Sequence, residues 1–109
     1  MKKLSLTLVL CALAFSAPAM ADAQLVQDKQ CMQCHAVAQD AIGPSFQNTA
    51  KRWKGQANAH TALLAVIQKG SDGSGGTHWG MKAKMPDTSE RPTISDDEGH
   101  RIVTWMLAQ

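Results

Sequence analysis

Two cysteines and a histidine stand together in the segment Cys31-Met32-Gln33-Cys34-His35. Thiols at this spacing could form a disulfide, a reactive redox pair, half of a zinc site, or two thioether bonds to a c-type haem, for which the directly following His is typical. A disulfide across two intervening residues encloses too short a loop to stabilise the fold much. The thiols are therefore more consistent with one of the other three chemistries.

The surrounding sequence favours haem attachment. A thioredoxin-type pair would need a strand–helix–strand context and a reactive thiolate, but no strand pattern precedes Cys31. A zinc site would need a second pair of ligands at matching spacing. The three other histidines are scattered along the chain and do not supply one: they are His60, His78 and His100. With Cys31 at the end of a helix, Cys34 and His35 would lie one turn further, so that both sulfurs reach one edge of a macrocycle while the imidazole binds its iron.

An iron bound by His35 needs a second axial ligand or keeps an open site. Met85 is the first candidate because it lies in a polar loop about 50 residues later and Pro86 holds the chain extended there. Met81 shares this loop but has no rigid neighbour, and His78 is the third candidate. The sequence therefore predicts a methionine thioether from the loop, with Met85 preferred.

The N-terminus has the pattern of an export signal. Two lysines precede an apolar stretch over residues 4–15, and Ala19-Met20-Ala21 then matches an A-x-A cleavage site. We expect residues 1–21 to be removed after Ala21 and residues 22–109 to form one exported domain.

Composition excludes several classes of protein. The chain has 109 residues, 11 of them Lys or Arg and 9 Asp or Glu. Lys2 and Lys3 belong to the predicted signal, so residues 22–109 are formally neutral and their charge gives no support for nucleic-acid binding. No apolar run after the signal is long enough for stable membrane insertion. Aromatic residues make up only 5% of the chain, so a bound cofactor would help to fill the core.

The remaining pattern predicts short helices and no strand. The expected helices cover 24–33, 46–54, the segment between Asn58 and Gly70, and a last segment that begins at Ser95. Asp22 and Asn58 are possible N-caps, and Ser95 with Glu98 forms a capping box. The stripe of the last helix ends with Met106, which reads as a core residue. The intervening loop, 70–93, is long enough that it should serve a function or wrap around something.

Taken together, these residues resemble the small class I c-type cytochromes of bacteria, especially the periplasmic monohaem electron carriers. The resemblance extends over most of 22–109 and rests on the haem motif at 31–35, Gly43-Pro44, Trp79-Gly80, Met85-Pro86 and the closing helix from Ser95 through Trp105. It implies an all-α cytochrome c fold, with three to five short helices wrapped around one covalently bound haem, and an electron carrier rather than an enzyme.

The resemblance also implies a role for each matching residue. Cys31 and Cys34 would form two thioethers to one haem c. His35 and Met85 would bind its iron, and the carbonyl of Pro44 would accept a hydrogen bond from the His35 ring.

Other positions are matched less directly. Trp79 would donate its indole N–H to a haem propionate, and Trp105 would pack where the terminal helices cross. Val26 and Gln30 stand where the family usually has an aromatic residue and a glycine. We therefore expect that helix crossing to be looser or shifted.

The implied function is one-electron transfer by a soluble, monomeric periplasmic carrier between respiratory or denitrification partners. The partners expected by resemblance are a membrane quinol-oxidising complex, a terminal oxidase and an enzyme of the nitrite reductase type. Six cations near the haem segments could steer an acidic partner: Lys29, Lys51, Arg52, Lys54, Lys82 and Lys84. The alternative is a haem enzyme or gas sensor, peroxidase-like, with an open or labile distal site.

Overall fold

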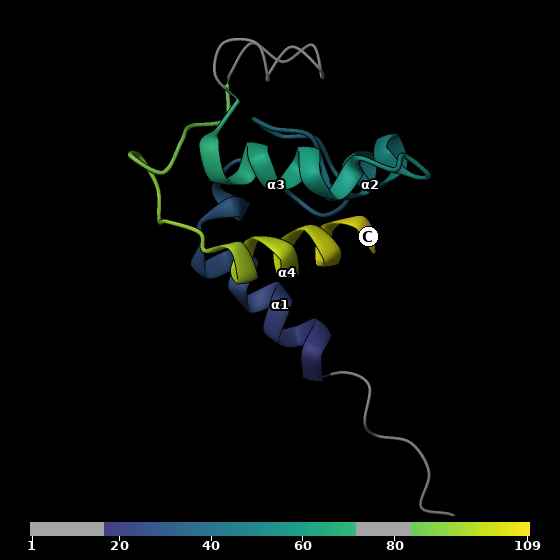
Figure 1. The fold of residues 1–109 in the computed structure, drawn as a ribbon, viewed down its shortest axis with the longest axis horizontal. Helices are drawn as coiled ribbons and strands as arrows, with labels where there is room; N and C mark the ends of the chain where they lie inside the picture. The colour runs from purple at the N-terminus through teal and green to yellow at the C-terminus, as the bar shows by residue number, and fades with distance from the viewer. Residues whose placement is uncertain (1–16, 72–83) are drawn as a thin grey trace, which may run out of the picture.

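The computed structural model describes residues 17–71 and 84–109, and in both ranges the secondary structure is helical (Figure 1). The elements are α1 (Ala17–Asp28), the 3-10 turn η1 (Cys31–Gln33), α2 (Phe46–Trp53), α3 (Ala59–Lys69) and α4 (Asp96–Leu107). No strand occurs in these two ranges, which confirms the all-α expectation. None of the helices in the described ranges is long and apolar enough to cross a membrane.

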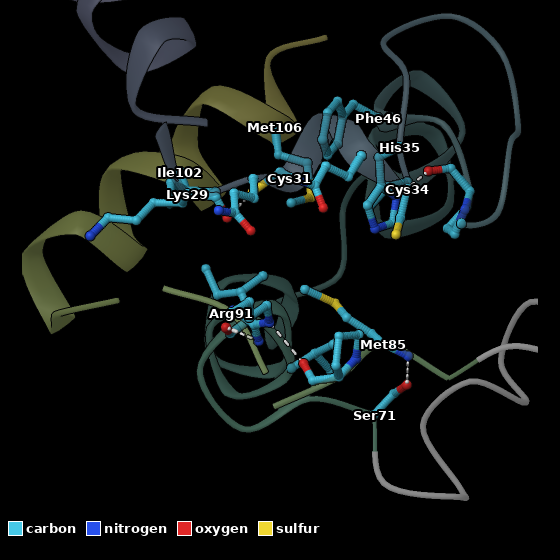
Figure 2. A pocket seen from close by; sticks show the side chains of 18 of the residues that line it. Lys29, Cys31, Cys34, His35, Phe46, Ser71, Met85, Arg91, Ile102 and Met106 are labelled. Carbon is cyan, nitrogen blue, oxygen red and sulfur yellow. Dashed lines mark hydrogen bonds between the residues drawn. The ribbon is translucent and has the colours of Figure 1, made fainter. Parts of the chain in front are cut away.

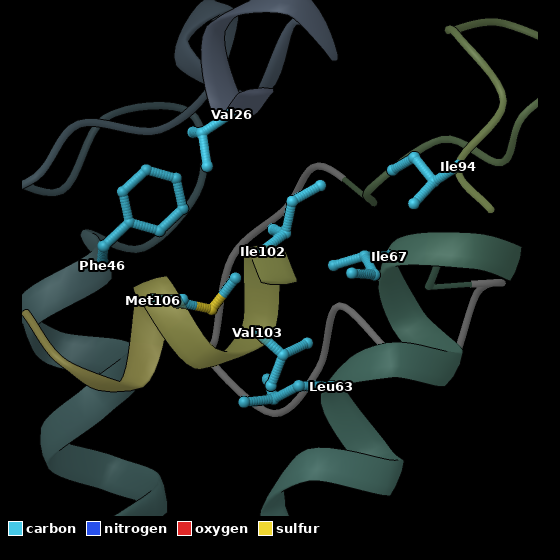
Figure 3. Close-up of a cluster of buried hydrophobic side chains, with 8 residues drawn as sticks. All are labelled: Val26, Phe46, Leu63, Ile67, Ile94, Ile102, Val103 and Met106. Atoms are coloured by element: carbon cyan, nitrogen blue, oxygen red, sulfur yellow. The ribbon is translucent and has the colours of Figure 1, made fainter. Parts of the chain in front are cut away.

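Helix α4 is the centre of the packing, since α1, α2 and α3 all contact it. In Figure 1 it lies between α1 on one side and α2 and α3 on the other. Ile102 and Val103 of α4 are 1% and 0% exposed, and Met106 lies beside them in the core, as the apolar stripe predicted (Figure 3). The core is completed by residues from the other segments: Val26, Phe46, Leu63, Ile67 and Ile94.

Helix starts are set by local side-chain hydrogen bonds. The predicted capping box is confirmed, because Glu98 N donates to Ser95 Oγ at 3.2 Å and Ser95 N donates to Glu98 Oε2 at 2.9 Å. Ser45 caps α2 in the same way, accepting from Asn48 N at 3.1 Å. Asn58 occupies the expected N-cap position of α3, but its side chain makes no capping hydrogen bond.

The first helix differs from the predicted span of 24–33 at both ends. It begins at Ala17 and ends at Asp28, so the cysteine motif lies on a separate 3-10 turn. The break is at Gln30, whose φ of 63° and ψ of 21° are left-handed and cannot continue a right-handed helix. This is the position at which the resemblance led us to expect a glycine, the residue that adopts this conformation without steric cost.

Two ion pairs join α1 and the residue that follows it to α4. Asp22 is not the N-cap that we expected; it lies inside α1, and its carboxylate accepts from Arg101 Nε at 2.9 Å. Lys29 Nζ lies 2.9 Å from Glu98 Oε2 and also donates to the carbonyl of Thr93 at 2.8 Å. Lys29 is therefore held within the fold, which weakens its assignment to a partner-steering surface.

The crossing of the terminal helices is closed although it lacks the expected aromatic residue. Val26 is only 1% exposed there. Trp105 of α4 packs edge-on against Phe46 of α2, with ring centroids 5.2 Å apart. An aromatic pair from α2 and α4 thus stands beside the smaller side chain of α1.

Candidate cofactor site

A large cavity opens between the segment that follows α1, the C-terminal half of α3 and the loop before α4 (Figure 2). It holds about 1340 Å³ of space not filled by protein atoms, counting its open side. Many of its lining side chains are apolar, among them Phe46, Leu63, Val66, Ile67, Ile102 and Met106. Because protein interiors are normally close-packed, such a space fits a bulky apolar group that completes the core.

One wall carries the cysteines and the histidine of the motif (Figure 2). The 3-10 turn brings them together, since Cys34 N and His35 N both donate to the carbonyl of Cys31, at 3.3 and 3.1 Å. Both thiols are free and half-buried. Burial raises the pKa of the Cys31 thiol, more than the charge of Arg91 lowers it. This is the opposite of the lowered pKa that makes redox cysteines reactive.

The other chemistries considered for the thiols have no support in the geometry. No disulfide joins Cys31 to Cys34. Within residues 17–71 and 84–109, no three His, Cys, Asp or Glu side chains come together as a metal site would require. The thiols are thus left facing the cavity.

The imidazole of His35 is held in one orientation. Its Nδ1 lies 2.7 Å from the carbonyl oxygen of Pro44 and donates to it, because that oxygen can only accept. The neutral ring then keeps its lone pair on Nε2, which is the form that binds a metal. Phe46 stacks on the ring at 5.4 Å, and a Cβ on Gly43 would lie 2.4 Å from His35 Cε1. The Gly43-Pro44 segment therefore serves the imidazole directly.

Met85 projects from the opposite wall of the cavity, with its thioether directed towards the side that carries His35 (Figure 2). Ser71 holds its backbone: Met85 N donates to Ser71 Oγ at 2.7 Å, and Ser71 N donates to the Met85 carbonyl at 3.0 Å. Ser71 is 4% exposed, so this pairing is shielded from water. The other candidates from the loop lie outside the described residues: they are His78, Trp79 and Met81.

Two residues that the sequence did not assign to the site also position Met85. Gly70 has a φ of 78°, and a Cβ there would lie 2.8 Å from the Met85 carbonyl oxygen. Arg91 donates from Nε to the carbonyl of Pro86 at 2.8 Å and from Nη2 to the carbonyl of Ile67. Burial lowers the pKa of the Arg91 guanidinium, which nevertheless stays charged near neutral pH. These contacts tie the Met85 segment to the end of α3.

Comparison with known proteins decides the family, because the family model for cytochrome c matches residues 20–109. The chain belongs to the cytochrome c family. It is 33% identical over 85 residues to cytochrome c-551 of Pseudomonas aeruginosa, covering 78% of this chain and 73% of that protein. It is 35% identical over 86 residues to cytochrome c2 of Rubrivivax gelatinosus, covering 78% of this chain and 93% of that protein. The crystal structure of Nitrosomonas europaea cytochrome c552 superposes with a TM-score of 0.66 at 27% sequence identity. The superposition covers 78% of this chain and 95% of that one.

This cytochrome c is therefore a one-electron carrier and not an enzyme, and its cofactor is one covalently attached haem c. The predicted resemblance, fold and cofactor are confirmed. The residues present fit the group: two free thiols, an imidazole with its Nε2 available and a facing thioether line one apolar cavity.

Proposed function

We propose that Cys31 and Cys34 form the two thioethers to the haem and that His35 and Met85 are its axial ligands. The observation that supports this proposal is that all four side chains line the same cavity. His35 and both thiols lie on one wall, and Met85 faces them from the opposite wall (Figure 2). When bound, the haem supplies an Fe(III)/Fe(II) couple that gains or loses one electron.

The protein's own residues prepare this couple. Pro44 fixes the tautomer of His35 through the 2.7 Å hydrogen bond, so Nε2 can bind the iron without reorganisation. Ser71 and Arg91 hold the backbone on both sides of the Met85 side chain. An iron bound by both His35 and Met85 would have no ligand position left for a substrate. The apolar walls limit access of water, which favours the less charged ferrous state and raises the reduction potential.

Trp79 remains our proposal for the residue that donates its indole N–H to a haem propionate.

Residues 1–21 are proposed to act as the export signal. The family match begins at residue 20, next to the expected cleavage site, which supports the boundary. Cleavage after Ala21 would keep Asp22 and its ion pair with Arg101 in the mature domain. Mass spectrometry of the periplasmic fraction should give a chain that begins at Asp22 and carries one haem.

The partners that we propose are a membrane quinol-oxidising complex as donor and a terminal oxidase or a nitrite reductase type of enzyme as acceptor. Membership in a family of electron carriers supports this choice. The test is to mix the reduced protein with each purified acceptor, and the oxidised protein with the reduced donor complex, and to follow the haem spectrum. If neither class of acceptor oxidises the protein, the proposed acceptors are wrong, whereas the proposed haem ligands are unaffected.

The axial assignment is tested by comparing two methionine variants. Met85→Ala should abolish the weak near-infrared absorption of thioether-bound ferric haem and lower the potential, because a harder ligand replaces sulfur. Met81→Ala should leave both unchanged. If the Met81 variant loses the band and the Met85 variant keeps it, the assignment is wrong.

Two further measurements complete the test. Carbon monoxide should not shift the spectrum of the reduced wild type, whereas a shift would favour the alternative of an open, peroxidase-like or gas-sensing site. In the variant with both Cys31→Ala and Cys34→Ala, acid acetone should extract the haem. Haem that resists extraction there would contradict thioether attachment through these two residues.

A further inference from the structure

Two histidines outside the haem cavity meet on the surface. His60 belongs to α3 and His100 to α4, and neither lines the cavity. Their Nδ1 atoms are 3.3 Å apart, and their rings stack with centroids 4.9 Å apart and planes inclined by 29°. The electron-transfer site makes no use of this pair.

The close approach of the two helices brings these side chains together. Gly99 of α4 is buried against α3, and a Cβ there would lie only 2.4 Å from Leu64 Cδ1. Leu64 is one turn after His60, and Gly99 directly precedes His100. The absence of a side chain at Gly99 thus sets the helix spacing beside the imidazole pair.

The 3.3 Å approach of the two Nδ1 atoms leaves room for at most one proton between them. A neutral imidazole has one N–H, so only one of the facing Nδ1 atoms can donate to the other. Thr104, one turn after His100, places its Oγ1 3.3 Å from His60 Nε2. When His60 carries its proton on Nε2, this hydroxyl oxygen accepts it and Nδ1 keeps a lone pair.

We propose that His60 and His100 form a surface site for a divalent late first-row transition metal ion such as Zn²⁺, bound through the two Nδ1 atoms. Two imidazole nitrogens on a tetrahedral zinc, each at 2.0–2.1 Å, are about 3.3–3.4 Å apart. The observed 3.3 Å matches this separation without movement of the helices. The metal ion takes the place of the hydrogen bond between the two Nδ1 atoms. Both rings bind it as neutral imidazoles with their proton on Nε2, so the ring that donated moves its proton from Nδ1 to Nε2.

The remaining metal ligands are water molecules. Within the described ranges no third His, Cys, Asp or Glu joins the pair in a metal-binding group. Such a site exchanges its metal readily, in contrast to a closed structural zinc site. Because the two histidines are 40 residues apart, the unfolded chain does not hold them together, so the ion stabilises the folded state and links α3 to α4.

The test uses the ferric holoprotein, titrated with zinc chloride and followed by calorimetry and thermal unfolding. We expect one bound Zn²⁺ per chain, a higher Tm and an unchanged haem spectrum. His60→Ala and His100→Ala should each weaken binding at least about tenfold, since each removes one of two protein ligands. Thr104→Val should weaken it by about 10–100-fold through loss of the partner of His60.

His78→Ala is the matched control, because it removes a histidine from the same chain while leaving the pair intact. Its affinity for Zn²⁺ should equal that of the wild type. The proposal is overturned if millimolar Zn²⁺ gives no binding or if either pair variant binds as well as the wild type. Loss of binding in the His78 variant would also overturn it. The haem spectrum of each variant is recorded to check that it remains folded, so these outcomes do not depend on the proposed haem ligands.

Discussion

The Nδ1 of His35 lies 2.7 Å from the carbonyl oxygen of Pro44, and the intervening loop leaves no space for a side chain at Gly43. The two neighbouring residues therefore have complementary roles. Pro44 accepts the imidazole proton, and Gly43 allows the ring to lie against the backbone. Together they fix the orientation of the His35 ring in the folded chain.

Replacement of Gly43 by alanine should destabilise the protein. The added Cβ would lie 2.4 Å from His35 Cε1, and such overpacking costs about 1–3 kcal/mol. Urea unfolding of the ferric holoprotein measures the loss, and the visible spectrum should change as the ring moves. Gly55→Asn is the control for steric overlap, because a Cβ there would meet no atom within 4 Å. Its φ of 77° still strains an L-residue, asparagine less than most, so the variant should lose less stability than Gly43→Ala. Equal stability of Gly43→Ala and the wild type would contradict the role of this glycine.

Ser71→Ala should loosen the segment that presents Met85. It removes the acceptor of the Met85 N–H, and an unpaired buried donor costs about 1–3 kcal/mol. We expect lower stability against urea and a weaker near-infrared band at elevated temperature. The exposed Ser89, which pairs with Asp87 in the following turn, provides the control variant Ser89→Ala. Equal effects of the two substitutions would show that the buried pairing is unimportant.

Gln30→Gly should increase stability. A left-handed conformation costs an L-residue about 1–2 kcal/mol, while glycine loses about 0.5–1 kcal/mol through chain entropy, so a net gain of about 0.5–1 kcal/mol is expected. The φ of Gln30 is 63°, which places its backbone in the left-handed region. Gln27→Gly, inside α1, should instead lose about 1 kcal/mol. Urea unfolding that gives the same sign for both would refute the argument.

Glu98 should contribute to stability at neutral pH and not in acid. The hydrogen bond from Ser95 N, and then that from Lys29, lowers the pKa of this carboxyl below its usual 4.5. A carboxyl with a lowered folded-state pKa stabilises the fold above its unfolded pKa, and this contribution disappears as the pH falls through the folded-state value. Unfolding free energies at pH 7 and pH 3 should therefore differ less in Glu98→Gln than in the wild type. A similar reduction in Glu90→Gln, an exposed residue of the preceding loop, would argue against a specific effect.

Removal of the haem should unfold the domain. The cavity between the cysteine motif, α3 and the loop before α4 would lose the haem, and the binding free energy that stabilises the folded state would be lost with it. We expect weak helical circular dichroism and no cooperative thermal transition in the apoprotein. A native-like transition without haem would show that the helices form a sufficient core alone.

Much of the local structure can be predicted because neighbouring residues produce it. The capping box of Ser95 and Glu98, the limits of α2 and the apolar stripe through Met106 all follow from interactions within a few positions. The motif from Cys31 to His35 identified the cofactor for the same reason, because the spacing of its three side chains is typical of c-type haem attachment.

Unfavourable backbone conformations and contacts between distant segments could not be predicted from the sequence. The end of α1 depends on a left-handed Gln30, a conformation that glutamine itself does not favour. Ser71 meets Met85 from a separate segment, and its serine is unremarkable in the sequence. His60 and His100 looked like scattered histidines until the packing of α3 on α4 brought their Nδ1 atoms to 3.3 Å. Local hydrogen bonding and periodicity depend on near neighbours, whereas these pairings depend on how helices and loops pack, which only the folded chain specifies.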